Sequence, residues 1–139
     1  MRDWQGVTKI LGPVLGWDRV LRGAAAEPYA ADRWGRSALP PVVFVPQSQD
    51  HVSMIARTLY EAGLPFVARG RGTGMSGGAL PMGRAAVISF EKMDRIIEVR
   101  PDAFEMTVEP GVLLSSVQAA AARAGQNFSL MAILSFPVI

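Results

Sequence analysis

A glycine-rich stretch from Arg69 to Ala79 holds the residues best suited to binding a ligand. It reads Arg-Gly-Arg-Gly-Thr-Gly-Met-Ser-Gly-Gly-Ala. Because glycine has no Cβ, such a run lets several backbone N–H groups face one point and lets a ligand approach the main chain, as in phosphate-binding loops. The arginines can add positive charge, and the threonine and serine can add hydroxyl donors. The sequence therefore predicts a loop that binds phosphate or pyrophosphate. The candidate residues are Arg69, Gly70, Arg71, Gly72, Thr73, Gly74, Met75, Ser76, Gly77 and Gly78.

Two named phosphate-binding motifs do not account for this stretch. Gly72-x-Gly74-x-x-Gly77 matches the dinucleotide fingerprint, but that fingerprint opens a helix, and here a segment containing proline and glycine follows. The ATP-type phosphate loop ends in Gly-Lys-Ser or Gly-Lys-Thr, and no lysine lies between Lys9 and Lys92. A third interpretation is a simple turn between strands, although five glycines exceed what a reversal of direction requires.

The elements before the glycine-rich stretch form a strand–helix–strand pattern. Residues 42–45 and 65–68 are apolar runs typical of short buried strands, and residues 49–62 show helical spacing of apolar residues. Ser48 is expected to cap that helix and Gly63 to end it. This βαβ unit predicts two parallel strands, and it places the glycine-rich stretch beyond the carboxyl end of the second one. Ligands of open α/β sheets bind at that edge.

The pattern then changes to closely spaced strands, at 86–90, 95–99 and 105–109. The last two are expected to form an antiparallel hairpin. A helix is predicted over 113–124, ended by Gly125. Before the βαβ unit, two short helices broken at Gly12-Pro13 are expected, with the tryptophans as packing residues. The fold class expected is α+β.

Composition excludes several classes of function. The chain has 139 residues, half of them hydrophobic, which suits one domain. Its net charge is +2, and its arginines are scattered along the chain and form no basic cluster that would indicate nucleic-acid binding. The absence of cysteine removes thiolate sites, and the single histidine, His51, is expected to face solvent and gives little support to a zinc site or a catalytic triad. With no long apolar run and no signal-peptide pattern, we expect a cytoplasmic protein without a membrane span.

At this point the residues resemble a known family. The stretch from Arg69 to Pro81 is similar to the pyrophosphate loop of FAD-linked oxidases of the vanillyl-alcohol oxidase and p-cresol methylhydroxylase (PCMH) type. Within that family it most resembles the flavin subunit of glycolate oxidase and D-lactate dehydrogenases. Segments 41–46, 64–70, 87–98 and 108–112 follow in the family's order and spacing, and the resemblance covers roughly residues 11 to 125.

The resemblance implies a cofactor and its contacts. Backbone amides from Gly70 to Gly77 would hold the FAD pyrophosphate, with the Thr73 and Ser76 hydroxyls assisting. Pro46 would lie near the nucleotide. Both Pro46 and Pro110 have an alternative role, which is only to end a strand. The main chain near the flavin would come from Pro110, Gly111 and Val112. The loop contains no histidine, so the FAD is expected to be non-covalent. The family oxidises small 2-hydroxy acids such as glycolate or D-lactate, and no residue of this chain is assigned a catalytic role.

The resemblance also suggests how the chain is organised. Residues 1–40 are expected to form a helical leader, residues 41–125 the first half of a PCMH-type FAD-binding domain, and residues 126–139 an apolar tail that departs from the family. Two hypotheses explain the tail: truncation, or a frame shift near Gln126, since codons for residues 130–134 read one base earlier can spell Asp-Gly-Asp-Pro. Two functional alternatives also stay open, a non-catalytic nucleotide-binding module and a non-functional remnant. The apolar tail and an open sheet edge would favour self-association.

Overall fold

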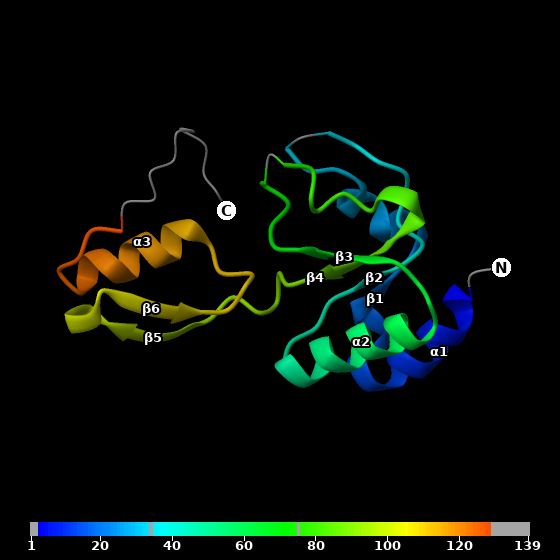
Figure 1. Cartoon of the computed structure of the whole chain (residues 1–139), viewed down its shortest axis with the longest axis horizontal. Coiled ribbons are helices and arrows are strands. Elements are labelled where there is room, and N and C mark those ends of the chain that lie inside the picture. Colours follow the sequence, from blue (N-terminus) through cyan, green and yellow to red (C-terminus); the bar gives the residue numbers. More distant parts are fainter. Residues whose placement is uncertain (1–2, 34, 75, 129–139) are drawn as a thin grey trace.

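The computed structural model describes residues 3–33, 35–74 and 76–128. The described chain forms two lobes, which Figure 1 shows side by side. The sheet lobe, residues 3–90, contains a four-stranded sheet, and the hairpin lobe, residues 95–128, contains a two-stranded hairpin and one helix. Together they give the α+β class expected from the sequence.

The sheet of the first lobe has the order β1-β2-β4-β3. Its strands are β1 (Val20–Leu21), β2 (Val43–Phe44), β3 (Phe66–Arg69) and β4 (Ala86–Ser89). Both β2 and β3 run parallel to β4, so the parallel direction predicted for the βαβ unit is confirmed. The two strands are not neighbours, however, because β4 lies between them. β4 is buried along its whole length, as a central strand requires, whereas β3 has exposed residues and lies at the edge.

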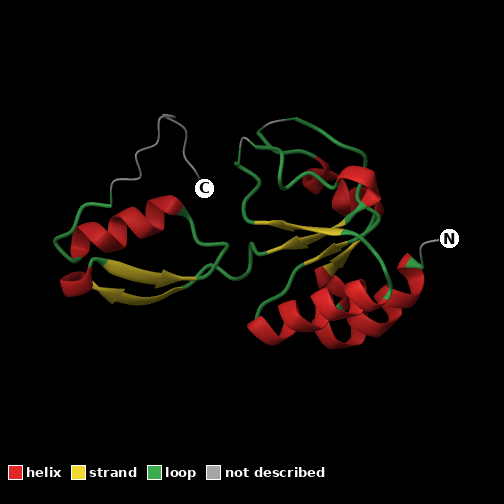
Figure 2. Cartoon of the chain, in the orientation of Figure 1, coloured by secondary structure: helices red, strands yellow, loops and turns green. Residues whose placement is uncertain are grey.

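Helices cover the two faces of this sheet, as Figure 2 shows. On one face lie α1 (Trp4–Leu15) and α2 (Gln49–Glu61), and on the other lies the 3₁₀ segment η2 (Gly23–Ala30). Successive side chains of a strand point to opposite faces. Accordingly Val42 and Phe44 pack with the α1 and α2 side chains, whereas Val43 and Val45 pack with η2. β1, from the predicted leader, pairs with β2, so leader residues complete the sheet.

The helix α1 is continuous through Pro13, so the prediction of two short helices broken at Gly12-Pro13 is wrong. Pro13 lies in the last turn, two residues before Leu15 at the helix end, so its missing N–H removes one hydrogen bond from a turn that is about to finish. Gly12 is buried beneath Trp17, because a Cβ on Gly12 would lie 2.5 Å from the Trp17 ring. Trp17 is nonetheless mostly exposed, whereas Trp4 is buried in the core as predicted.

The predicted ends of α2 are confirmed. The Ser48 hydroxyl accepts a hydrogen bond from the His51 N–H at 3.2 Å, and Gly63 follows the helix with a positive φ of 61°. His51 is half-buried, so the expectation that it faces solvent is only partly met. None of the described helices combines the length and the apolar character needed to cross a bilayer.

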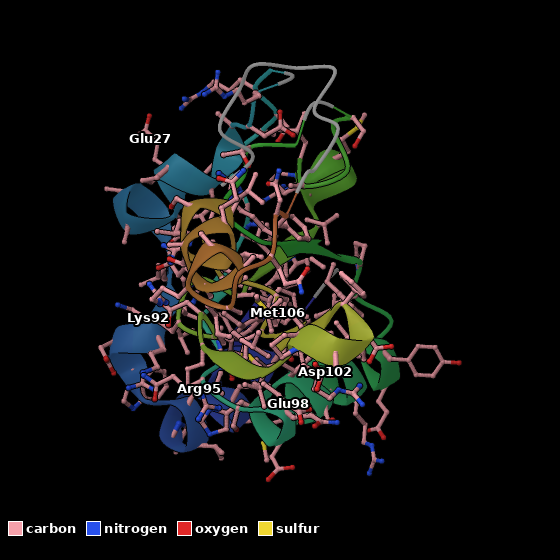
Figure 3. All side chains as sticks on the ribbon, turned by 90° about the vertical axis from the view of Figure 1, so that its left-hand side faces the viewer. Glu27, Lys92, Arg95, Glu98, Asp102 and Met106 are labelled. Atoms are coloured by element: carbon pink, nitrogen blue, oxygen red, sulfur yellow. The ribbon has the colours of Figure 1, made fainter. Side chains whose placement is uncertain are left out.

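The hairpin lobe consists of β5 (Ile96–Arg100), β6 (Glu105–Val108) and α3 (Leu114–Arg123). β5 and β6 pair antiparallel, which confirms the predicted hairpin. α3 packs beside the hairpin with small and branched apolar residues inward, and Gly125 follows it with a φ of 71°. Figure 3 shows this lobe from its end, with Met106 of β6 labelled. Of the predicted tail, residues 129–139 lie outside the described residues.

Candidate functional site

The glycine-rich stretch begins at the edge of the sheet where ligands of parallel sheets bind. Because β2, β3 and β4 are parallel, their carboxyl ends meet at one edge. The stretch from 70 to 78, the glycine loop, leaves β3 there. Gly72 and Gly77 have φ values of 70° and 74°, a left-handed conformation that side chains rarely adopt. Two glycines of the loop are therefore required by the backbone itself.

Arg69, the last residue of β3, lies beneath the loop rather than in it. Its relative exposure is 9%, and its guanidinium fills the space where a Cβ on Gly72 would lie, 2.1 Å from Nη2. Burial lowers the pKa of Arg69, while the negative charge of Asp32 opposes that shift. Within the described chain, Nη1 of Arg69 is buried without a hydrogen-bond partner. A buried cationic donor therefore lies directly under the loop.

A polar cluster surrounds Arg69. The Tyr29 hydroxyl donates to both carboxylate oxygens of Glu91 at 3.0 Å, and the Ser89 hydroxyl donates to one of them at 3.1 Å. The Arg69 guanidinium lies 5.7 Å from the centre of the Tyr29 ring, within cation–π range. Sequence reasoning missed this cluster, since Tyr29 belongs to the predicted leader. Its members come from η2 and from the ends of β3 and β4, so the cluster fixes the floor of the site.

The pKa of Tyr29 provides a direct test of this cluster. Burial first, and then the charge and hydrogen bond of Glu91, raise the pKa of Tyr29 to about 12, against the opposing charge of Arg69. The chain has two tyrosines, so a Tyr60→Phe variant leaves Tyr29 as the one tyrosine signal. We expect its tyrosinate absorbance to appear with a midpoint near 12.

The same shift affects stability at alkaline pH. An unfolded tyrosine ionises near pH 10, whereas folded Tyr29 keeps its proton up to about 12. The cluster's contribution is therefore complete below pH 10 and is lost as the pH rises to 12. Tyr29→Phe is the control and should lack this alkaline decrease. A midpoint near 10 in the Tyr60→Phe variant would mean that Tyr29 is not held by Glu91.

The turn after β6 lies against the start of the glycine loop. A Cβ on Gly70 would lie 3.4 Å from the carbonyl oxygen of Pro110, and one on Gly111 would lie 1.9 Å from the carbonyl oxygen of Phe90. The Gly111 N–H donates to the Met93 carbonyl at 2.8 Å. Pro110 is exposed, Gly111 is buried, and the next residue, Val112, is half-buried. The structure thus brings together the two segments that the resemblance placed around one ligand.

Charged side chains fix this turn. The buried carboxylate of Glu109 accepts the Arg95 N–H at 2.8 Å and its Nη2 at 2.7 Å, and these bonds hold the pKa of Glu109 below its ordinary value. Arg71 donates from Nε to the Gly111 carbonyl at 3.0 Å, and its Nη2 lies 3.4 Å from Asp94. Sequence reasoning predicted Arg71 as a ligand residue and placed Glu109 in the segment near the flavin, but it gave the Glu109 side chain no role and did not identify Asp94 or Arg95. Glu109 directly follows β6, and Asp94 and Arg95 come just before β5, so charged residues at the strand ends are the signal that could have indicated them.

The other predicted site residues occupy three kinds of position. Pro46 is fully buried just after β2, at the same edge of the sheet. Thr73 and Gly77 are half-buried in the loop, while Gly74, Ser76 and Gly78 are exposed. Met75 lies outside the described residues. The roles assigned to these residues stay predictions. Within the described chain no group of histidine and carboxylate side chains is arranged to hold a metal ion.

Comparison with known proteins places this geometry in a family. A family model described as an FAD binding domain matches residues 40–135. The chain is 32% identical over 127 residues to an uncharacterized FAD-linked oxidoreductase of Mycobacterium tuberculosis, covering 89% of this chain and 28% of that protein. It is 39% identical over 93 residues to a D-lactate dehydrogenase of Archaeoglobus fulgidus, covering 67% and 21%. It is 34% identical over 88 residues to the glycolate oxidase subunit GlcD of Escherichia coli, covering 61% and 17%.

Solved structures share the fold. p-Cresol methylhydroxylase with bound substrate superposes with a TM-score of 0.75 at 23% identity, over 88% of this chain and 25% of that chain. The 4-ethylphenol oxidase of Gulosibacter chungangensis also gives 0.75, at 24% identity and the same coverage. The chain thus spans about a quarter of the length of these proteins. The matched residues include the glycine loop and the Pro110–Val112 turn, so the chain belongs to the FAD binding domain family, whose cofactor is FAD.

Proposed function

We propose that this chain is the FAD-binding portion of a flavin-dependent oxidoreductase that acts on small 2-hydroxy acids of the glycolate and D-lactate type. The substrate class is supported by the relatives named as D-lactate dehydrogenase and glycolate oxidase subunit. The assignment of cofactor binding to these residues is supported by the geometry of the loop.

One observation carries the proposal: the buried Nη1 of Arg69 lacks a hydrogen-bond partner within the described chain and lies beneath the glycine loop. A buried cationic donor without a partner is costly, and a bound anion would satisfy it. The FAD pyrophosphate would lie over the loop, held by its backbone N–H groups and by the Thr73 and Ser76 hydroxyls. Pro46 would face the nucleotide, and the Pro110–Val112 turn would face the flavin.

The chemistry divides between cofactor and chain. When bound, the flavin supplies the group that accepts hydride from the 2-hydroxy acid. The residues of this chain hold and orient it: Arg69 supports the loop from below, and the turn at Gly111 closes the site from the hairpin lobe. No residue of the described site is assigned to the acid substrate. The loop has no histidine, so we propose that the loop holds the cofactor without a covalent bond.

The first test is a titration of the purified chain with FAD, followed by quenching of flavin fluorescence. We expect saturable binding. When the protein is denatured and removed, we expect the flavin to remain in the solution. A folded chain that is indifferent to FAD would contradict the proposal. Glycolate or D-lactate is expected to bleach the bound flavin only where residues that hold the acid are also supplied, because none is assigned in this chain.

Substitution of Arg69 tests the observation itself. Arg69→Met keeps an apolar stem above the Tyr29 ring and removes the guanidinium, so FAD affinity should fall by about tenfold, the lower range for a charge-assisted hydrogen bond. The control is Arg57→Met, which removes the same charge from an exposed position on α2. Equal affinity in the two variants would mean that Arg69 does not contact the ligand.

A further inference from the structure

Arg71 connects the glycine loop of the sheet lobe to the hairpin lobe. Its Nε donates to the carbonyl of Gly111 at 3.0 Å, and its Nη2 lies 3.4 Å from the Asp94 carboxylate. Gly111 follows β6, and Asp94 lies in the segment that leads from β4 to β5. One side chain therefore contacts both segments at the point where the two lobes meet.

The segments that Arg71 contacts are themselves held together. The Gly111 N–H donates to the Met93 carbonyl at 2.8 Å, and the Phe90 N–H donates to the Arg69 carbonyl at 2.8 Å. Met93 and Gly111 are buried. Arg71 is thus anchored to a well-packed part of the hairpin lobe, because its acceptor is a carbonyl in a turn that has little room to move.

The two arginines of the stretch therefore differ. Arg69 has a buried Nη1 without a partner in the described chain, whereas two nitrogen atoms of Arg71 are engaged by protein acceptors, one of them a carboxylate. The Asp94 charge partly neutralises Arg71, which makes Arg71 a poorer attractor of phosphate than its place in the loop suggests. The sequence expectation that both arginines add charge to the ligand does not take this difference into account.

We propose that Arg71 is a positioning residue: by joining the glycine loop to Gly111 and Asp94, it sets the spacing between the two segments that hold the cofactor. The proposal rests on the proposed function, since the ligand whose binding depends on this spacing is FAD. A positioning role and direct phosphate binding require different properties of the Arg71 side chain. Positioning needs the planar guanidinium and its two acceptors, whereas phosphate binding needs a positive charge without a competing carboxylate.

The decisive variant is Asp94→Asn. If Arg71 positions the loop, loss of the carboxylate weakens FAD binding, by about threefold because both side chains are partly exposed, at 28% and 54%. If Arg71 binds phosphate, the same variant releases it from its partner, and FAD binding tightens. Asp102→Asn is the control, since it removes the same charge from the exposed turn of the hairpin, labelled in Figure 3. Unchanged or tighter binding in Asp94→Asn overturns the proposal.

Substitutions of Arg71 itself give a second test of the positioning role. Arg71→Lys keeps the charge but loses the paired geometry, so its FAD affinity should fall by about tenfold, close to that of Arg71→Met. A lysine variant with wild-type affinity would show that charge alone is needed and would overturn the proposal.

Hydrogen exchange without FAD separates this proposal from the proposed function. In Arg71→Met, amide exchange within 90–95 and 110–113 should accelerate by about tenfold, while exchange in β2 and β4 stays unchanged and confirms the fold. If the wild-type chain binds no FAD, the proposed function fails and this exchange alone decides the role of Arg71. Unchanged exchange in both segments overturns it.

Discussion

Replacing Gly111 with alanine is expected to destabilise the protein by about 3 kcal/mol, the upper range for overpacking a site that has no room. The added Cβ would lie 1.9 Å from the Phe90 carbonyl oxygen, 2.7 Å from the Phe90 carbonyl carbon and 2.9 Å from the Met93 carbonyl oxygen. All three atoms belong to the backbone, so no side-chain rotation can relieve the contact. Relief requires separation of the turn from the Phe90–Met93 segment.

Urea unfolding of the Gly111→Ala variant measures this effect. The matched control is Gly74→Ala, because a Cβ there meets no atom of the described chain within 4 Å and the φ is not positive. That variant should lie within about 0.5 kcal/mol of the wild type, as is usual for surface substitutions. A Gly111→Ala protein with an unchanged midpoint would show that the turn does not lie against Phe90.

Replacing Gly72 with valine is expected to weaken FAD binding by about 100-fold, because a branched residue held at positive φ and pressed on a neighbour costs about 3 kcal/mol. Gly72 has a φ of 70°, and its Cβ would lie 2.1 Å from Nη2 of Arg69. The valine therefore distorts the loop backbone and displaces the guanidinium assigned to the anion. Both effects act on the groups that would bind pyrophosphate.

Gly74→Val is the companion variant. Gly74 lies two residues further along the same loop, with open space around its Cβ position and no positive φ. Because the pyrophosphate would approach the backbone of Gly74 as well, this variant should also weaken FAD binding in a titration, but by less than Gly72→Val, since it leaves the loop backbone and Arg69 in place. Equal losses in the two variants would mean that any bulk in the loop blocks the ligand, and that Arg69 and the backbone conformation of Gly72 have no special role.

The parts of the fold that the sequence predicted are local. The two ends of α2, at Ser48 and Gly63, could be predicted because a helix cap and a positive φ depend on a few neighbouring residues. The glycine loop was placed after β3 for the same reason, since glycine spacing and the preceding apolar run are adjacent in sequence. The resemblance then supplied the second segment, at Pro110–Val112.

The parts that it missed depend on distant contacts. Tyr29 and Glu91 are 62 residues apart, and Arg71 and Asp94 are 23 apart, and no periodicity or local motif links such pairs. The position of β4 between β2 and β3 was missed because strand order reflects pairing across the sheet. The continuity of α1 through Pro13 was missed because the cost of a proline depends on how close the helix end is.

The strand order has a consequence for how the chain folds. β2 and β3 cannot pair with each other, because each forms its ladder with β4, which follows both in the sequence. As the chain leaves the ribosome, the two earlier strands therefore have unpaired edges until residues 86–89 arrive between them. Non-local pairing of this kind is slow, and the unpaired edges are open to association in the meantime. The carboxyl ends that form the floor of the site come together only at this step, so the nascent chain has no cofactor site until β4 has inserted.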